Sequence, residues 1–230
     1  IGVQSFNDAH LKALGRVHNR DQAMAAVEEA RSAFETFNLD LMYALPGQTL
    51  LDLKQDVQTA LSFKPPHISI YHLTIEPNTY FAKFPPSVPE DDLAYDMLDH
   101  LVARASQTGL ARYEVSAYAR PGRECVHNLV YWRFGDYLGL GAGAHGKRSL
   151  LDAAGRVRSI HRTEQVREPR RYQRDPAATL KVHEVEPAQR PFEFMLNALR
   201  LTGGIERSLF EVRTGLPWST VAPQVERAIA

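Results

Sequence analysis

The apolar positions in the first half of the chain recur with two alternating periods. Short apolar runs typical of buried strands occupy Ile1 to Phe6, Leu39 to Ala44 and Ile68 to Tyr71. Apolar residues three and four apart, the spacing of a helix, recur in the segments 7–14, 21–37, 49–64 and 89–107. Strands that alternate with helices predict an α/β fold with a parallel sheet and right-handed crossovers.

Local signals predict the ends of these helices. Thr49 with Asp52 three residues later forms a capping-box pattern, in which each side chain satisfies a free backbone N–H. Pro89 suits the first position of the 89–107 helix, and Gly109 suits the cap beyond its end. The helical spacing also places Phe34 on the apolar face of the 21–37 helix.

The pattern changes after Arg112, where short extended pieces, glycines and prolines dominate. It predicts a strand over 113–118, with Glu114 as a candidate polar ligand or an ordinary strand carboxylate, and a hairpin over 149–161. Helical spacing returns at 191–201 and in a helix-turn-helix over 206–230. We therefore expect two domains, residues 1–150 and 151–230.

Composition narrows the class of protein. The chain has 230 residues, 44% hydrophobic and 23% charged, with a formal net charge of zero, so no global charge favours nucleic acid or an anionic membrane. Its one cysteine, Cys125, excludes an internal disulfide framework and fits a reducing, cytoplasmic compartment. No apolar run approaches the roughly 20 residues of a membrane span, no signal peptide is visible, and a first residue already within a strand suggests truncation.

Three polar residues of the first domain form a candidate ligand site. Gln4 and Asp40 lie in predicted strands, and Arg16 follows the first short helix. In a parallel (β/α) barrel such positions converge on one mouth. There an arginine can grip a carboxylate, and an aspartate can accept from ribose hydroxyls or an ammonium. The trio would suit a ligand with an amino-acid end and a sugar, although the spacing alone is more often structural.

A second candidate site lies at His127, Tyr131 and Trp132, within the run HNLVYW. Neutral imidazole is a common axial ligand of heme iron, and the two aromatic rings offer flat faces to a porphyrin. His145 is a lesser candidate for heme or metal contact. The alternative is that these are core or hydrogen-bonding residues. No catalytic residue and no metal-ligand set is predicted.

Two further patterns favour a structural explanation. Gly141 to Lys147 matches the start of a phosphate-binding loop, but Arg148 stands where that loop needs Ser or Thr, and a hairpin follows instead of a helix. Its glycines are expected to allow close backbone approach. Seven arginines that could meet propionates or a partner are expected to lie on a solvated surface: Arg156, Arg158, Arg162, Arg167, Arg170, Arg171 and Arg174.

Three motifs together resemble one family. They are Gly2-Val3-Gln4-Ser5-Phe6, the run NLDLMYALPGQ over 38–48, and HNLVYW over 127–132. The family is the radical-SAM proteins related to oxygen-independent coproporphyrinogen III oxidase, and the third motif resembles the signature of its heme chaperone branch. Family members usually carry glycine where this chain has Ala44. The resemblance implies that Gln4, Arg16, Asp40 and, on the adenine side, Thr74 bind S-adenosylmethionine.

The same resemblance implies an architecture and a function. We expect the later part of an open radical-SAM (β/α) barrel and a smaller helix-rich C-terminal segment, incomplete at its end. The full-length relative would bind a [4Fe–4S] cluster, S-adenosylmethionine and heme, and would deliver heme to a respiratory protein. The cluster needs a cysteine triad that this chain lacks, so the chain is expected to be inactive alone.

Several alternatives remain open at this point. One is a coproporphyrinogen III oxidase of porphyrin biosynthesis, and another is a non-enzymatic heme-binding or interaction fragment. An unrelated nucleotide-binding barrel would require phosphate binding at Gly141 to Lys147. A homodimer is also open, because exposed strand edges invite association. The sequence does not identify the heme acceptor, the axial ligand or the mode of heme attachment.

Overall fold

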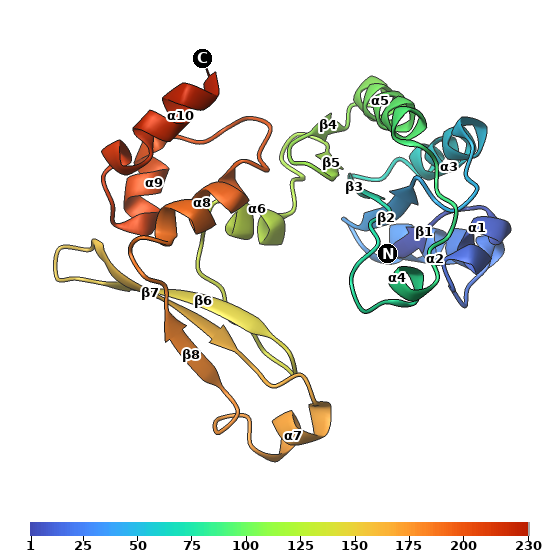
Figure 1. The fold of residues 1–230 in the computed structure, drawn as a ribbon. Helices are drawn as coiled ribbons and strands as arrows, with labels where there is room; N and C mark the ends of the chain where they lie inside the picture. The colour runs from blue at the N-terminus through green and yellow to red at the C-terminus, as the bar shows by residue number, and fades with distance from the viewer. Residues whose placement is uncertain (230) are drawn as a thin grey trace. The chain divides into compact units, whose positions relative to one another are not determined.

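The computed structural model describes residues 1–229, which divide into two compact units (Figure 1). Unit 1 comprises Ile1–Cys125 and unit 2 comprises Val126–Ala230. The boundary between them precedes the domain boundary expected at 150/151. Each unit has its own buried apolar cluster.

Unit 1 is an α/β structure built on a five-stranded sheet. Its strands are β1 (Gly2–Gln4), β2 (Asn38–Tyr43), β3 (His67–His72), β4 (Ala111–Arg112) and β5 (Ala117–Ala119). Its helices are α1 (Asp8–Ala13), α2 (Arg20–Ala33), α3 (Leu50–Ser62), α4 (Tyr80–Lys83) and α5 (Asp91–Gln107).

The three strands expected from the strand–helix alternation pair in parallel as predicted, and two short strands further along the chain make the whole sheet of unit 1 mixed. Its strand order is β1-β2-β3-β5-β4, and only the first three strands are parallel. β4 and β5 form a short hairpin, and β5 pairs antiparallel with β3. The strand predicted over 113–118 is therefore wrong at its start, because residues 113–116 form the hairpin connection. Glu114 is buried there, and its Oε1 accepts from the backbone N–H of Ser116.

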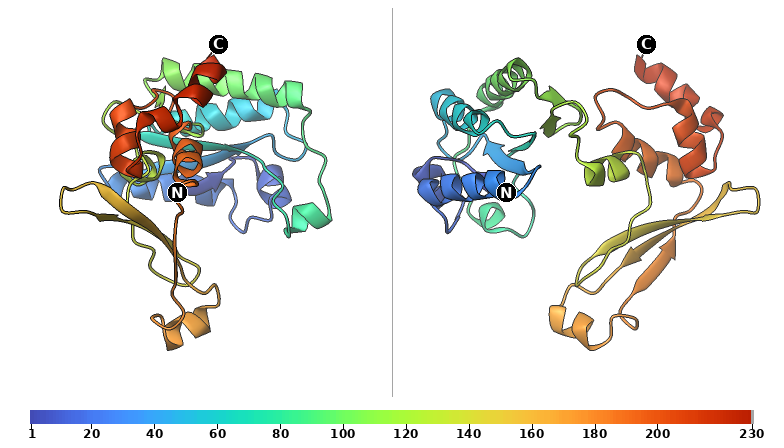
Figure 2. Two further views of the ribbon diagram at one scale, coloured as in Figure 1. Left: turned by 60° about the vertical axis from the view of Figure 1, so that its left-hand side comes forward. Right: turned by 180° about the vertical axis from the view of Figure 1, so that it is seen from behind.

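The two faces of this sheet differ in chemistry. Alternate residues of the strands, such as Leu39, Leu41 and Ile68, pack with α2, α3 and α5 into the core. The intervening positions of β2 and β3 carry polar side chains, among them Asn38, Asp40 and Ser69. Figure 2 shows the helices α3 and α5 side by side on the sheet. One face thus holds the fold together, and the other presents polar groups.

Several predicted helix ends are confirmed and two are corrected. Thr49 and Asp52 form the capping box at the start of α3, and Gly109 follows α5 with a φ of 80°. Phe34 is not on the apolar face of α2, because the helix ends at Ala33 and Phe34 is 65% exposed. Pro89 precedes α5 without starting it, because Glu90 is the N-cap residue.

Unit 2 combines an antiparallel sheet with short helices. Its strands are β6 (His145–Leu151), β7 (Val157–Glu164) and β8 (Lys181–Glu184), paired in that order. Its helices are α6 (Val126–Trp132), α7 (Pro169–Arg174), α8 (Arg190–Ala198), α9 (Arg207–Thr214), the 3₁₀ turn η1 (Trp218–Thr220) and α10 (Ala222–Ile229). The hairpin predicted over 149–161 is confirmed as β6 and β7, and the predicted C-terminal helices correspond to α8, α9 and α10.

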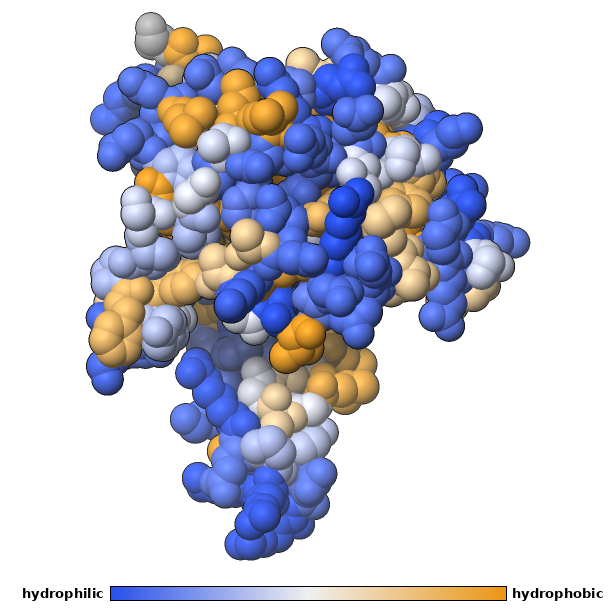
Figure 3. Space-filling view, turned by 90° about the vertical axis from the view of Figure 1, so that its right-hand side faces the viewer, coloured by the Kyte–Doolittle hydropathy of each residue, from blue (hydrophilic) through white to orange (hydrophobic). Residues whose placement is uncertain are grey.

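Aromatic rings form the centre of unit 2. Phe134, Phe194, Phe210 and Trp218 contact one another in sequence, edge to face, with centroid distances of 5.2–5.7 Å. Such edge-to-face pairs are favourable beyond the area that they bury. On the face of the molecule drawn in Figure 3, apolar and polar side chains are intermixed.

Candidate ligand sites in the two units

Gln4 and Asp40 lie on the neighbouring strands β1 and β2 of the unit 1 sheet. The parallel register pairs Gly2 with Asp40, and Asp40 in turn with Ser69. The register shifts between Gly2 and Gln4, so Gln4 pairs with Leu41 and the position of its side chain does not follow from strand alternation. A Cβ at Gly2 would lie 2.9 Å from the Gln4 side-chain nitrogen, so the amide of Gln4 folds back over Gly2. The side chain of Gln4 therefore extends toward the position that Asp40 flanks.

Gln4 has an unusual backbone conformation. Its φ of 67° lies in the left-handed region, which residues other than glycine seldom adopt, and the residue is buried. Such conformations cluster at ligand sites, where the surrounding fold maintains them. Ala44, just after β2, is also left-handed with a φ of 56°. This conformation gives a physical reason for glycine at that position in the resembling family.

Asp40 is held from one side by the neighbouring polar residues. Its Oδ1 accepts from the Asn38 amide nitrogen at 2.7 Å. The Asn38 Oδ1 lies 2.6 Å from His67 Nδ1 and accepts from Ser69 Oγ at 3.1 Å. His67 Nε2 lies 2.8 Å from the Tyr113 hydroxyl. Asp40 itself remains half-exposed, which leaves part of its carboxylate accessible to a ligand.

Arg16 and Thr74 lie in exposed loops of the same unit. Arg16 follows α1, and its side chain makes no hydrogen bond or ion pair with residues 1–229 that the structure describes. Thr74 follows β3, and its hydroxyl donates to the His72 carbonyl at 3.5 Å. No hydrogen bond or ion pair joins either residue to Gln4 or Asp40 within the described part of the chain. Their assignment to S-adenosylmethionine stays a prediction.

The second candidate site lies on α6, a helix that the sequence pattern did not predict. The exposed imidazole of His127 meets the ring of Tyr131 one turn later, with centroids 4.6 Å apart and planes at 88°. Tyr131 also contacts Tyr137 at 4.3 Å. The Arg200 guanidinium lies 4.3 Å from the centre of the Trp132 ring and stacks on it. His127 is thus an accessible ligand group beside an aromatic ring, while Trp132 is engaged within the unit.

His145 begins β6 and is exposed. The backbone of His145 lies so close to Gly139 that any Cβ at position 139 would overlap its carbonyl. Within the 141–147 run, the expectation of close backbone approach is confirmed at Gly146, where a Cβ would lie 3.1 Å from the Gly139 backbone nitrogen, but not at Gly141, where it would meet nothing within 4 Å. No described contact brings His145 to His127.

Lys147 has a structural role that excludes it from binding phosphate. Its side chain is buried, and its Nζ donates to the Phe134 carbonyl, to Asp136 Oδ1 at 2.9 Å and to Ser149 Oγ. Burial lowers the pKa of Lys147, an effect that Asp136 opposes. Burial alone would raise the pKa of Asp136, but the hydrogen bonds from Lys147 and Ser149 lower it overall. Because a strand begins at His145, no helix N-terminus follows these glycines.

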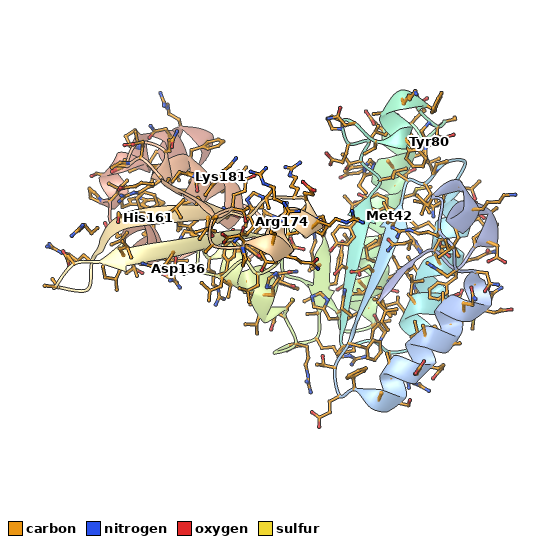
Figure 4. All side chains as sticks on the ribbon, turned by 90° about the horizontal axis from the view of Figure 1, so that it is seen from below. Met42, Tyr80, Asp136, His161, Arg174 and Lys181 are labelled. Atoms are coloured by element: carbon orange, nitrogen blue, oxygen red, sulfur yellow. The ribbon has the colours of Figure 1, made fainter. Side chains whose placement is uncertain are left out.

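Two of the seven arginines between residues 156 and 174 form ion pairs. Arg156 pairs with Asp152, and Arg162 pairs with Glu193 at 2.6 Å while donating to the Tyr137 hydroxyl. The other five side chains are exposed. Figure 4 labels Arg174 on α7 and, in the sheet, His161 on β7 and Lys181 on β8; in unit 1 it labels Met42, on the polar face of β2, and Tyr80 on α4.

Residues 1–229 do not fit an iron–sulfur cluster. The chain has one cysteine, Cys125, whereas such clusters are held by several thiolates. No group of three or more His, Cys, Asp or Glu residues in the described part of the chain is arranged to hold a metal ion. Within the same residues, no helix is long and apolar enough to span a membrane.

Comparison with known structures defines the class of fold. The structure titled "Coproporphyrinogen III oxidase (HemN) from Escherichia coli is a Radical SAM enzyme" matches with a TM-score of 0.73 and 18% sequence identity. The match covers 98% of this chain and 56% of that one. Residues 185–230 also match the HemN C-terminal domain. The chain therefore has the mixed α/β fold of the corresponding part of a radical-SAM enzyme.

Sequence relatives narrow the class further. The heme chaperone HemW of Haemophilus influenzae is 44% identical over 230 residues, and that of Escherichia coli is 43% identical over 231. HemW of Bacillus subtilis is 33% identical over 235 residues. These matches cover this whole chain but only 58–60% of each relative. The chain is similar over its whole length to HemW proteins and spans about three fifths of the length of these relatives.

Some residues of the first site were not found from the sequence. Asn38, His67 and Tyr113 were not singled out, although Asn38 donates to Asp40 and the other two follow it in a series of hydrogen bonds. One usable signal was the alternation in β2 and β3, which places Asn38 and His67 on the same face as Asp40. The partner Tyr113 was not detectable in this way, because a hairpin far along the chain supplies it.

Proposed function

We propose that this chain is part of a heme chaperone that binds heme and S-adenosylmethionine and delivers heme to a respiratory-chain protein. The observation that carries the proposal is the similarity over the whole chain to proteins named heme chaperone HemW. The same proposal places the protein in the cytoplasm. Coproporphyrinogen oxidase activity has weaker support, because that likeness has 18% identity and concerns the fold alone.

Unit 1 is the proposed S-adenosylmethionine-binding part. The supporting geometry is the polar sheet face, where Gln4 is folded over Gly2 and Asp40 is held by Asn38. In this assignment Asp40 accepts from the ribose hydroxyls and Gln4 binds the same ligand through its amide. Arg16 contributes its guanidinium to the ligand carboxylate, and Thr74 contacts the adenine side. No step is assigned to an iron–sulfur cluster, since these residues do not fit one.

Unit 2 is the proposed heme-carrying part. His127 is exposed on α6 and offers a ring nitrogen to heme iron, and Tyr131 next to it offers an aromatic surface. His145 and Trp132 remain candidates of lower rank, because one lacks an aromatic neighbour among the described contacts and the other is stacked on Arg200.

A heme titration of the purified chain, followed by its Soret absorbance, tests this proposal. The wild-type chain should show a saturable shift, and His127→Ala should weaken the apparent affinity by roughly tenfold, the effect of losing one coordinating or charged contact. Because His127 is exposed, the substitution should leave the fold intact. His183→Ala, an exposed histidine of β8, is the matched control. Equal binding by both variants, or no saturable shift in the wild type, contradicts the assignment.

A further inference from the structure

The hydrogen bonds around Asp40 form a continuous chain through the polar face of unit 1. It begins at the Cys125 backbone nitrogen, 3.3 Å from the Tyr113 hydroxyl, and passes through His67 and Asn38 to the carboxylate. His67 is only 4% exposed. None of these groups belongs to the hydrophobic core that holds the sheet to its helices.

The Asp40 carboxylate at the end of this series of hydrogen bonds determines which group donates and which accepts in each bond. A carboxylate only accepts, so Asn38 must present its NH₂ group to Asp40 and its oxygen to His67. The His67 Nδ1 facing that oxygen must then carry a proton. Burial lowers the pKa of His67, so the ring is neutral and its Nε2 accepts from the Tyr113 hydroxyl. All the donors therefore point toward Asp40.

We infer that Asn38, His67 and Tyr113 are positioning residues for ligand binding by Asp40. Asn38 occupies Oδ1 and thereby fixes the carboxylate orientation, which directs the remaining acceptor positions toward the ligand. His67 prevents the Asn38 amide from reversing, and Tyr113 selects the His67 tautomer. Aligned hydrogen bonds polarise one another, so the far end of the chain also strengthens the bond to Asp40. The inference rests on the proposed binding of S-adenosylmethionine at this face.

Titration calorimetry with S-adenosylmethionine on the full chain tests the inference. Asn38→Ala should weaken binding by roughly tenfold, because it frees the carboxylate, and Tyr113→Phe should weaken it by roughly twofold to threefold, because it acts from further away. His67→Gln should retain most of the affinity, since its amide can both donate to Asn38 and accept from Tyr113. Tyr118→Phe, in the same hairpin but on the core side, is the matched control.

The outcomes separate the inference from the function on which it rests. If Asp40→Asn loses binding while Asn38→Ala and Tyr113→Phe bind like the wild type, the positioning role is refuted and the binding site stands. If the wild type does not bind, or Asp40→Asn binds equally well, both fail.

A second measurement does not need the ligand. Long-range ¹H–¹⁵N NMR spectra should place the His67 proton on Nδ1 in the wild type, and Asn38→Ala should abolish that preference. If the wild-type His67 ring is protonated on Nε2 alone, the proposed order of hydrogen-bond donors toward Asp40 is wrong.

Discussion

Two buried charged side chains, Asp56 in unit 1 and Lys147 in unit 2, have different kinds of partner. In unit 1, the buried carboxylate of Asp56 accepts from the Ser5 hydroxyl at 2.6 Å and from the Phe6 backbone at 2.7 Å, both neutral donors. In unit 2, the buried ammonium of Lys147 pairs with the carboxylate of Asp136. Burial accordingly raises the pKa of Asp56, whereas Asp136 has a lowered pKa despite its partial burial.

This difference shows which charged residues are available to a ligand. The Lys147 ammonium is occupied by three acceptors inside unit 2, so a lysine in a glycine-rich motif is there a structural residue. On the polar face of unit 1, the neutral Asn38 amide occupies one oxygen of Asp40, and the residue remains half-exposed. A carboxylate held in this way keeps acceptor capacity for a ligand.

The largest expected effect is the loss of the buried ammonium in unit 2. Lys147→Ala should lower the free energy of unfolding by roughly 3 kcal/mol, because it leaves a cavity and removes the partner of Asp136 and of the Phe134 carbonyl. Urea unfolding followed by tryptophan fluorescence reports on this unit, since both tryptophans, Trp132 and Trp218, lie in it. Lys181→Ala, an exposed lysine of β8, is the control. Equal unfolding midpoints for the two variants would contradict a structural role for Lys147.

Loss of the buried Asp56 carboxylate in unit 1 should lower the free energy of unfolding by less, because its hydrogen-bond donors are neutral. Asp56→Ala should lower the stability of unit 1 by roughly 2 kcal/mol, since the Ser5 hydroxyl and Phe6 N–H lose their acceptor. Hydrogen exchange of amides in residues 1–125 measures it, and Asp96→Ala on the exposed side of α5 is the control. Asp56→Asn keeps a side-chain acceptor, so its loss of stability should fall between those of Asp56→Ala and Asp96→Ala. A larger loss of stability in Asp56→Ala than in Lys147→Ala would contradict the expected order of the two units.

The smallest expected effect is a pH dependence of unit 1. Burial lowers the pKa of His67, and the weaker attraction of Asp40 and Glu124 opposes this. As pH falls below the ordinary value of about 6.5, the unfolded chain takes up a proton that folded His67 resists, so stability decreases until the folded pKa is reached. Between pH 7.5 and 5.5, unit 1 should lose up to about 1 kcal/mol relative to His67→Gln.

Hydrogen exchange of unit 1 amides at the two pH values measures this loss of stability in the wild type and in His67→Gln. Asp56 contributes equally in both proteins, so its contribution cancels when they are compared. Tryptophan fluorescence of unit 2 should show no corresponding dependence on His67. An identical pH profile for wild type and His67→Gln in unit 1 would show that burial of the ring carries no electrostatic cost.

Local features were predictable wherever neighbouring residues decide the conformation. The capping box of Thr49 and Asp52 and the hairpin over 149–161 follow from side chains within a few residues of each other. Phe34 was misplaced because helical spacing alone does not show that α2 ends at Ala33. The strand expected over 113–118 failed because that segment turns back to pair with β4, a choice that depends on the adjoining sheet.

The sequence by itself determined the alternation of elements in unit 1, the motifs that resemble the family, and Gln4, Asp40 and His127 as candidate ligand residues. Only the tertiary structure decided that Asp40 is held by Asn38 and through it by His67 and Tyr113, and that Lys147 is buried against Asp136. The physical reason is that hydrogen bonds and ion pairs depend on separations of about 3 Å in space. Residues far apart in the chain reach those distances only when the strands pair.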